Sequence, residues 1–388
     1  MASPFSRRAL AAALAATALA LAAACGGGGG DETPAGPPAA AAGGAVRLVV
    51  AGDSLADVGT FGLKATVQNA SNPAAGYPVY PERVATQLGA GTLCNHFSSS
   101  DRLVYSTRAG CTDFAVGGAQ ILNPITHGGS ALPLSLAFQL ESALAANGGA
   151  WRAGDLILLD AGGNDAAALA DAYLDARAGG TAEEAIYLAL LGQQLDASTI
   201  TQALAQPDGR AVAAGLYLQR LAQTWWSTVK ANTLDRGATR VALLNLPDIT
   251  LTPRFRGIVA GLASAEGSAA ASAFQGALRQ WIAGFNAELA RLAAGEPRVA
   301  LVPYFEDFTA NVADPAAFGL TNATDASCPP AGDFPACTDA ALDAAPPAGL
   351  AVGWWKTWYF SDEFHPSPRG HELIAATVLR ALERAGWR

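Results

Sequence analysis

Short apolar runs, bounded by turn residues, recur along the chain and predict buried strands. The clearest of these runs cover residues 46–51, 155–160, 239–246 and 298–302, and a fifth, with a weaker pattern, covers residues 112–116. Between the runs, apolar residues spaced by three and four positions predict amphipathic helices, most clearly at residues 274–292. A last helix is predicted at about residues 370–385.

Alternating strands and helices predict an α/β fold, in which a mainly parallel sheet is covered on both faces. Parallel strands need long crossover connections, which are usually helices, so the expected architecture is a three-layer α/β/α sandwich. Reactive side chains are then expected just beyond the carboxyl ends of the strands. Two segments are longer than this scaffold requires, and we interpret residues 165–235 and 306–358 as insertions.

The first 25 residues have the pattern of a secretion signal. Arg7 and Arg8 precede an uncharged run of Ala and Leu that is short for a membrane span. The run ends in Leu21-Ala22-Ala23-Ala24-Cys25, which resembles the lipobox of bacterial lipoproteins. The resemblance implies a lipid anchor on Cys25, and therefore an outer-membrane lipoprotein facing the periplasm or the cell surface. Ordinary cleavage and plain secretion are the alternative.

Residues 26–44 consist largely of Gly, Pro and Ala and predict a flexible tether, which leaves residues 45–388 as one domain. With 33 acidic against 24 basic residues, the net charge of −9 argues against nucleic acid as a partner. Hydrophobic residues make up 51% of the chain and charged residues 15%, so the chain can bury a large core.

Four cysteines remain once Cys25 is set aside, and an exported protein is expected to pair them in disulfides. Three pairings are possible, and closeness along the chain favours Cys94 with Cys111 and Cys328 with Cys337. A zinc site is the poorer interpretation, because the chain has no Cys-x-x-Cys spacing and its four histidines are scattered. We therefore predict neither a metal nor an organic cofactor.

Ser54 lies in Gly52-Asp53-Ser54-Leu55, directly after the first predicted strand. A nucleophilic serine needs this kind of exposed position, with backbone N–H groups nearby to bind developing negative charge. Taken alone, the four residues fit a turn or a helix cap equally well.

Three further motifs follow in order along the chain. Residues 113–119 carry Gly117 and Gly118, which would let a backbone N–H approach an oxyanion closely. Residues 160–165 follow the strongest strand and offer the Asn164 amide as a donor. Residues 360–366 place Asp362 three positions before His365, so that one loop can present a base and the carboxylate that orients it.

These four blocks resemble those of the SGNH hydrolases of the GDSL type, named for Ser, Gly, Asn and His. The resemblance implies a flavodoxin-like sheet of five strands and hydrolysis of carboxylic esters through an acyl-enzyme. It further implies a catalytic set of Ser54, His365 and Asp362. By register, the oxyanion hole combines the N–H groups of Ser54 and Gly118, with Gly117 as a rival for the latter, and the Asn164 amide. The family usually has Asn where this chain has Asp113.

One further acidic residue and three histidines are predicted to have structural or surface roles and no catalytic role. We interpret Asp165 as a helix cap, His371 as a surface or capping residue, and His96 and His127 as structural or surface residues. Several aromatics precede Asp362, and we hypothesise that Trp355 and Trp358 line a cleft for an apolar acyl or alcohol group. The alternative is that these aromatics pack the inserted segment.

The sequence is also compatible with three other functions. They are acyl transfer to an alcohol, deacetylation of a polysaccharide, and surface binding without catalysis. The Gly-x-Ser-x-Gly motif is absent, which argues against the α/β-hydrolase fold.

Overall fold

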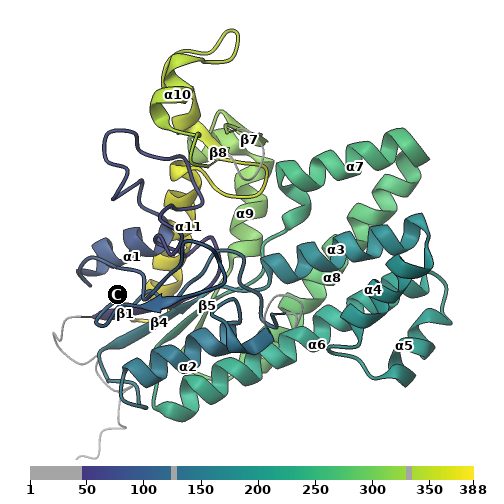
Figure 1. Cartoon of the computed structure of the whole chain (residues 1–388), viewed down its shortest axis with the longest axis horizontal. Coiled ribbons are helices and arrows are strands. Elements are labelled where there is room, and N and C mark those ends of the chain that lie inside the picture. Colours follow the sequence, from purple (N-terminus) through teal and green to yellow (C-terminus); the bar gives the residue numbers. More distant parts are fainter. Residues whose placement is uncertain (1–45, 124–128, 329–333) are drawn as a thin grey trace, which may run out of the picture. The chain divides into compact units, whose positions relative to one another are not determined.

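A parallel sheet of four strands forms the centre of the domain (Figure 1). Its strands, in spatial order, are β1 (Arg47–Ala51), β4 (Asp155–Leu159), β5 (Val241–Leu244) and β6 (Val299–Val302). Every residue of β4 and β5 is buried, because helices cover both faces of the sheet. All four strands lie where the apolar runs predicted them.

The structure, a computed structural model, describes residues 46–123, 129–328 and 334–388. The predicted secretion signal with Cys25, the predicted tether and His127 lie outside these ranges. Within them, no helix is both long enough and apolar enough to cross a membrane.

The predicted fifth strand is present as an irregular segment beside β1. Residues 112–116 run parallel to β1, where the Val50 N–H donates to Thr112 O (2.9 Å) and the Phe114 N–H donates to Val50 O (2.8 Å). On its other side the segment is held by a backbone bond from His96 to Asp113 O (2.6 Å). With this segment at the edge, the sheet has the flavodoxin-like order expected from the sequence.

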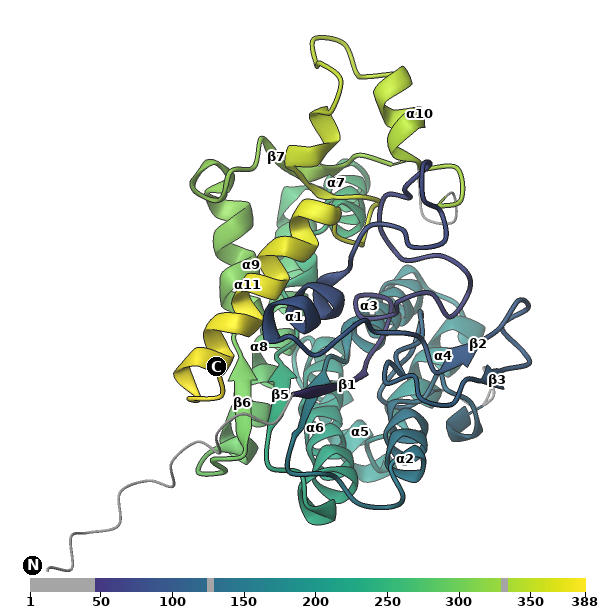
Figure 2. The same cartoon turned by 90° about the vertical axis from the view of Figure 1, so that its left-hand side faces the viewer.

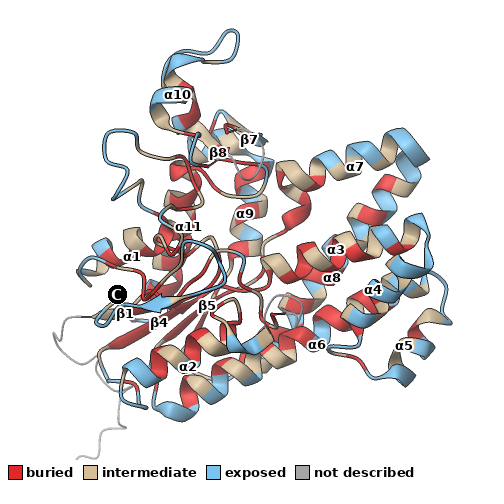
Figure 3. Ribbon diagram, in the orientation of Figure 1, coloured by how far each residue is buried: buried red, intermediate tan, exposed pale blue. Residues whose placement is uncertain are grey.

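Side chains of β1 alternate between two hydrophobic cores, as the pleat of a strand requires. Val49 and Ala51 belong to the larger core, which α2 (Leu136–Ala146), α6 (Gly209–Asn232) and α8 (Ser268–Ala293) cover. Leu48 and Val50 belong to the second core, under α1 (Tyr80–Leu88), α9 (Tyr304–Ala313) and α11 (Pro368–Arg384). Figure 2 shows the two helical layers on opposite sides of the strands, and Figure 3 shows the buried residues between them. The predicted three-layer α/β/α class is confirmed.

The first predicted insertion divides into two parts. It contains α3 (Gly163–Ala178), α4 (Thr181–Leu191), α5 (Ala197–Leu204) and α6. Helix α6 buries Tyr217, Leu221 and Trp225 in the larger core and therefore belongs to the covering layer of the sheet. Helices α4 and α5 bury few residues and form the added part. Helix α7 (Pro253–Glu266) packs against α8 in the same region.

The second predicted insertion likewise begins with a scaffold helix, because α9 buries Phe308 and Val312 in the second core. The rest of it contains β7 (Asn322–Ala326), which pairs in parallel with β8 (Trp358–Phe360), and the short helix α10 (Asp339–Ala344). The remaining regular elements are the strand pair β2 (Phe97–Ser98) and β3 (Ser106–Thr107), and 3₁₀ turns at Gly129–Ala131, Leu234–Arg236, Ile249–Leu251, Pro315–Phe318 and Trp354–Thr357.

Two disulfides cross-link segments that connect the regular elements, and both predicted pairings are confirmed. Cys94 bonds Cys111 across a separation of 17 residues, and Cys328 bonds Cys337 across 9 residues. The first disulfide ends directly before the segment that runs beside β1. The second lies in a small separate core with Val67, Leu342 and Trp355.

Replacing Cys94 and Cys111 together by Ser should lower the free energy of unfolding by about 3 kcal/mol, because the bond closes a loop in the unfolded chain. Urea unfolding followed by circular dichroism measures this loss. The pair Cys328 and Cys337 closes a shorter loop, and its double Ser variant should lose slightly less, about 2.5 kcal/mol. Unchanged stability in the first variant would contradict the expectation.

Candidate active site

Ser54 follows β1 at the carboxyl edge of the sheet, two residues after a glycine beside which the Asp160 side chain leaves no room for a Cβ atom. A Cβ atom on Gly52 would lie 2.3 Å from the Asp160 Oδ1 atom, closer than any real contact. The buried Gln139 side chain of α2 exchanges two hydrogen bonds with the Gly52 backbone, at 2.9 and 3.0 Å. The start of the Ser54 loop is therefore fixed on two sides.

His365 and Asp362 lie in the short loop between β8 and α11. The Asp362 Oδ1 atom accepts the backbone N–H groups of Phe364 (2.8 Å) and His365 (2.5 Å), so the carboxylate shapes its own loop. Ser367 ends the loop by capping α11, where its side chain accepts the N–H groups of Arg369 and Gly370. Pro368 at the first helical position also favours a helix start there.

The two ends of the domain meet in a chain of side-chain hydrogen bonds. The Ser54 Oγ atom lies 2.8 Å from His365 Nε2, and His365 Nδ1 lies 2.8 Å from Asp362 Oδ2. Burial works to raise the pKa of Asp362, but the charge of His365 and the hydrogen bonds from its ring and backbone outweigh burial and hold this pKa below its ordinary value. An ionised Asp362 can only accept, so Nδ1 carries the ring proton and Nε2 can accept the Ser54 hydroxyl.

Gly118, not Gly117, has the free backbone N–H in the second block. The Gly117 N–H donates to the buried Asp57 Oδ2 atom (2.8 Å), which also ties this block to the loop of Ser54. Among the described residues, no protein acceptor binds the Gly118 N–H. Gly118 has a φ of +86°, a conformation that other residues rarely adopt. The geometry thus favours Gly118 over its rival.

Asn164 stands in the first turn of α3, after Gly162 with a φ of +96°. Its Nδ2 atom donates to Ala119 O at 2.9 Å and, over a longer distance of 3.4 Å, to Asp53 Oδ2. The first bond joins the third block to the second. The long second bond leaves one amide proton weakly held on the side of Asp53, the neighbour of Ser54.

Beneath Ser54 lies a buried pair of carboxyl groups that sequence reasoning did not identify. Asp160 accepts the Asp53 N–H (2.9 Å) and the Tyr80 hydroxyl (2.6 Å). Burial and the neighbouring Asp53 raise the pKa of Asp160 to about 8, and burial also raises the pKa of Asp53. Both aspartates belong to the recognised blocks, which was an available signal, whereas nothing in the sequence around Tyr80 pointed to this contact.

Several structural interpretations need correction. Asp165 lies in the first turn of α3 but does not cap it, because Gly162 holds the N-cap position and the buried Asp165 carboxyl accepts the Ile121 N–H (3.1 Å). His371 is fully buried, not on the surface, and its Nδ1 atom accepts the Tyr80 N–H (3.2 Å). Burial lowers the pKa of His371 to about 3, which keeps the ring neutral. His96 needs no correction, because it is buried and stacks on Phe114, which agrees with the structural one of its two interpretations.

The tryptophans predicted to line a cleft lie elsewhere. Trp355 is buried beside Cys328 and Cys337, and its Nε1 atom donates to Asp343 (2.9 Å). Trp358 packs edge-on against Trp354. Neither lines the pocket beside Ser54, so packing of the insertion, the alternative given above, describes them correctly.

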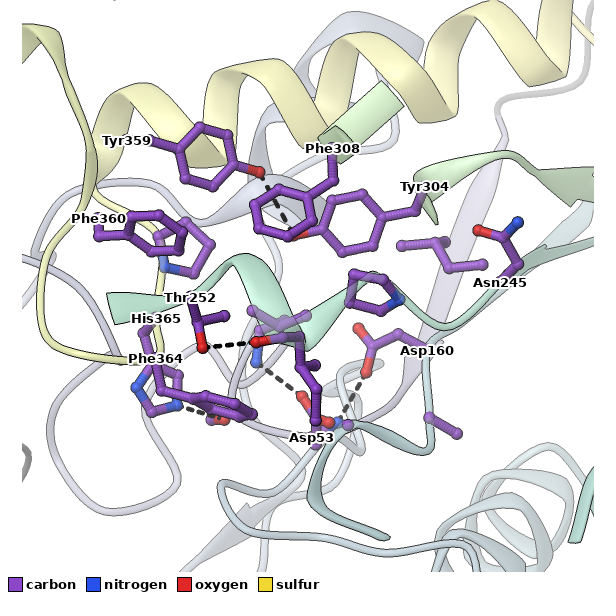
Figure 4. A pocket seen from close by; sticks show the side chains of 18 residues that line it. Asp53, Asp160, Asn245, Thr252, Tyr304, Phe308, Tyr359, Phe360, Phe364 and His365 are labelled. Atoms are coloured by element: carbon purple, nitrogen blue, oxygen red, sulfur yellow. Dashed lines mark hydrogen bonds between the residues drawn. The ribbon is translucent and has the colours of Figure 1, made fainter. Parts of the chain in front are cut away.

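A pocket opens directly beside Ser54 and His365, both of which line it (Figure 4). Its far end is formed by Tyr304, Phe308 and Tyr359, which Figure 4 shows grouped away from Asp53 and His365. These aromatics come from α9 and β8, the elements at the two ends of the second predicted insertion, and of the three only Phe308 lies within residues 306–358. In the part of the chain that the structure describes, no group of three or more His, Cys, Asp or Glu side chains could hold a metal ion.

The layered sheet, with Ser54 and Asn164 beyond the ends of β1 and β4 and with His365 hydrogen-bonded to Ser54, has the SGNH hydrolase fold. The chain belongs to the GDSL-like lipase/acylhydrolase family, whose sequence profile matches residues 48–378. This membership supports a hydrolase that acts on esters. No curated protein matches the chain in sequence.

Two solved structures are similar to this chain. One is the lipase Lip_vut3 from a goat rumen metagenome, with 15% identity and a TM-score of 0.38, over 87% of this chain and 97% of that chain. The other is an extracellular lipase from Streptomyces rimosus, with 15% identity and a TM-score of 0.40, over 87% of this chain and 99% of that chain.

The buried Asp165 should make stability depend on pH. Burial raises its pKa to about 7 in the folded protein, against about 3.9 in an unfolded chain. Between these values the folded protein holds one more proton, so this residue lowers the free energy of unfolding by up to roughly 1.4 kcal/mol per pH unit as pH rises.

Asp165→Asn should remove that contribution and flatten the fall in stability between about pH 4 and pH 7. Urea unfolding at a series of pH values measures the slope. Asp175→Asn, on the exposed surface of the same helix, is the control for loss of one carboxylate. Parallel pH profiles for the wild type and Asp165→Asn would show that this carboxyl is not responsible.

Proposed function

We propose that this protein is a serine esterase that hydrolyses carboxylic esters through an acyl-enzyme on Ser54. The observation that carries the proposal is the hydrogen-bonded series from Ser54 Oγ to His365 Nε2 and from His365 Nδ1 to Asp362, each link at 2.8 Å. A serine hydroxyl becomes a useful nucleophile when a neutral imidazole can take its proton.

In the proposed cycle, Ser54 Oγ attacks the ester carbonyl carbon while its proton passes to His365 Nε2. Asp362 stabilises the resulting imidazolium and holds the ring in place. The imidazolium then gives the proton to the departing alcohol, which leaves Ser54 acylated. Water enters, loses a proton to His365 and attacks the acyl group, after which Ser54 regains its proton and the acid departs.

The developing oxyanion would be held by the N–H groups of Ser54 and Gly118 and by the Asn164 amide. Such donors contribute most when they are already fixed in position before the reaction. The positive φ of Gly118 and the bond from Asn164 to Ala119 O both fix donor groups in this way. The weakly held second proton of Asn164 is the one available to an oxyanion.

We also propose that the protein is exported and anchored by a lipid on Cys25 in the outer membrane. The proposal rests on the basic start, the Ala/Leu run and the Cys25 motif of the sequence. Metabolic labelling with a palmitate analogue in a bacterial host tests it, with Cys25→Ser as the control. Labelling that persists in Cys25→Ser, or no labelling in either protein, would contradict it.

Ser54→Ala should lower kcat for a chromogenic ester by roughly a millionfold, since no other group forms the acyl-enzyme. Ser264→Ala removes an exposed hydroxyl on α7 and is the matched control, with activity unchanged. Mass spectrometry after mixing with a slow ester should show an acyl adduct on Ser54 in the wild type alone. Comparable activity in Ser54→Ala would rule the mechanism out.

Asn164→Ala should lower kcat by about a hundred- to a thousandfold with little change in KM, because an oxyanion donor acts mainly on the transition state. Steady-state kinetics with the same ester measure both constants. A rise in KM at constant kcat would instead assign Asn164 to substrate binding.

A further inference from the structure

We propose that the pocket beside Ser54 is the acyl-binding site, and that it accepts short, uncharged acyl groups from acetyl to about butyryl. The inference rests on the proposed esterase function and specifies its substrate class. It makes the protein an esterase for short acyl chains, not a lipase for long ones.

The position of the pocket supports an acyl site. Ser54 and His365 line it, whereas Gly118 and Asn164 do not. An ester whose carbonyl oxygen occupied the proposed oxyanion hole could therefore direct one of its two substituents into the pocket. The other substituent would remain outside the pocket.

The far end of the pocket is formed by buried side chains, and this burial indicates which substituent enters. The alcohol must leave after the first step, and water must then reach the same carbonyl carbon next to His365. A closed pocket would trap the alcohol and obstruct the water. The acyl group, in contrast, stays bonded to Ser54 throughout, so a closed pocket suits it.

The pocket is small, with a cavity volume of about 40 Å³. A cavity that holds a single water molecule needs roughly 10–15 Å³, so this cavity has room for only a few groups of that size. An acetyl, propionyl or butyryl chain places one to three carbons beyond its carbonyl. A chain of eight carbons would not fit without displacing the walls.

The walls have little freedom to move, because they belong to the second hydrophobic core. Tyr304, Phe308 and Tyr359 are each at most 4% exposed. The Phe308 ring lies 5.8 Å from that of Tyr304 and 5.2 Å from that of Tyr359. Making room for a longer chain would disturb these packed rings, and such overpacking is costly in a protein interior.

The polar groups in the lining favour an uncharged acyl chain. The Asn245 side chain is already bonded to the Phe305 N–H and to Glu306, and the Thr252 hydroxyl is bonded to Ile249 O. The lining includes the carboxyl groups of Asp53 and Asp160 and neither Lys nor Arg. A dicarboxylic acyl group such as succinyl would therefore have to bury its second carboxylate without a cationic partner.

The first test compares p-nitrophenyl esters that share one alcohol and carry acyl chains of two to twelve carbons. The wild type should show its highest kcat/KM between two and four carbons and lose about a hundredfold by eight carbons. A second series with a constant acetyl group and alcohols of increasing size should vary by less than about tenfold. A maximum at eight carbons or more, or strong dependence on the alcohol alone, would overturn the inference.

The second test enlarges the far end of the pocket. Phe308→Ala should raise kcat/KM for the eight-carbon ester relative to acetate by at least about tenfold. Phe308→Leu removes less volume, retains more of the core packing and should shift the preference in the same direction by a smaller amount. Trp358→Ala, in the same segment but outside the pocket, should leave the chain-length preference unchanged.

The outcomes separate this inference from the proposed function. If Ser54→Ala abolishes hydrolysis and folded Phe308→Leu keeps the wild-type profile, the esterase proposal stands and the acyl-site inference fails. If Ser54→Ala remains active, the proposed function itself fails, whatever the chain-length profile shows.

Discussion

The hydrogen bond between Ser54 and His365 joins residues 311 positions apart, and the arrangement of the fold determines whether it can form. Ser54 follows the first strand, whereas His365 precedes the last helix. His365 follows β8, which pairs with β7 outside the central sheet, and α11 packs against β5 and β6, so the loop before α11 meets the loop after β1. Gly52 pressed against Asp160 fixes one partner, and the Asp362 loop capped by Ser367 fixes the other. The bond thus depends on tight local structure at both ends.

That tight structure places several carboxyl groups in the interior below the site. Asp53, Asp57, Asp113, Asp160 and Asp165 are all buried, and burial raises the pKa of each. Burying such groups is unfavourable unless hydrogen bonds compensate. Here the compensation comes mainly from backbone N–H groups of neighbouring loops, such as Gly117 with Asp57 and Ile121 with Asp165. These bonds hold together loops that share no regular secondary structure, at a cost to stability that grows as pH rises above about 3.9, the pKa of an unperturbed Asp.

The sequence was sufficient for the strands, the fold class, both disulfides and the identity of the residues around Ser54. Each of these has a local signal: an apolar run, a short cysteine spacing or a glycine-rich turn. It was not sufficient for contacts that depend on the packing of distant segments. Tyr80 meets Asp160 only because α1 covers the sheet edge, and Trp355 turns inward only because a disulfide and Val67 surround it. Helix α6 was assigned to an insertion because its length, not its buried face, was visible in the sequence.

The reacting groups of the site and the far wall of its pocket come from different parts of the chain. Ser54, Gly118 and His365 lie in loops and Asn164 lies in the first turn of α3, whereas the far wall of the pocket comes from α9 and β8. Of the three aromatic wall residues only Phe308 lies within the predicted insertion at 306–358, so a change at Phe308 can alter the pocket without moving the reacting groups. Phe308 and Tyr359 lie in the second core, however, so such changes must also preserve the packing beneath α11. Chain-length preference and stability are therefore coupled through the same aromatic rings.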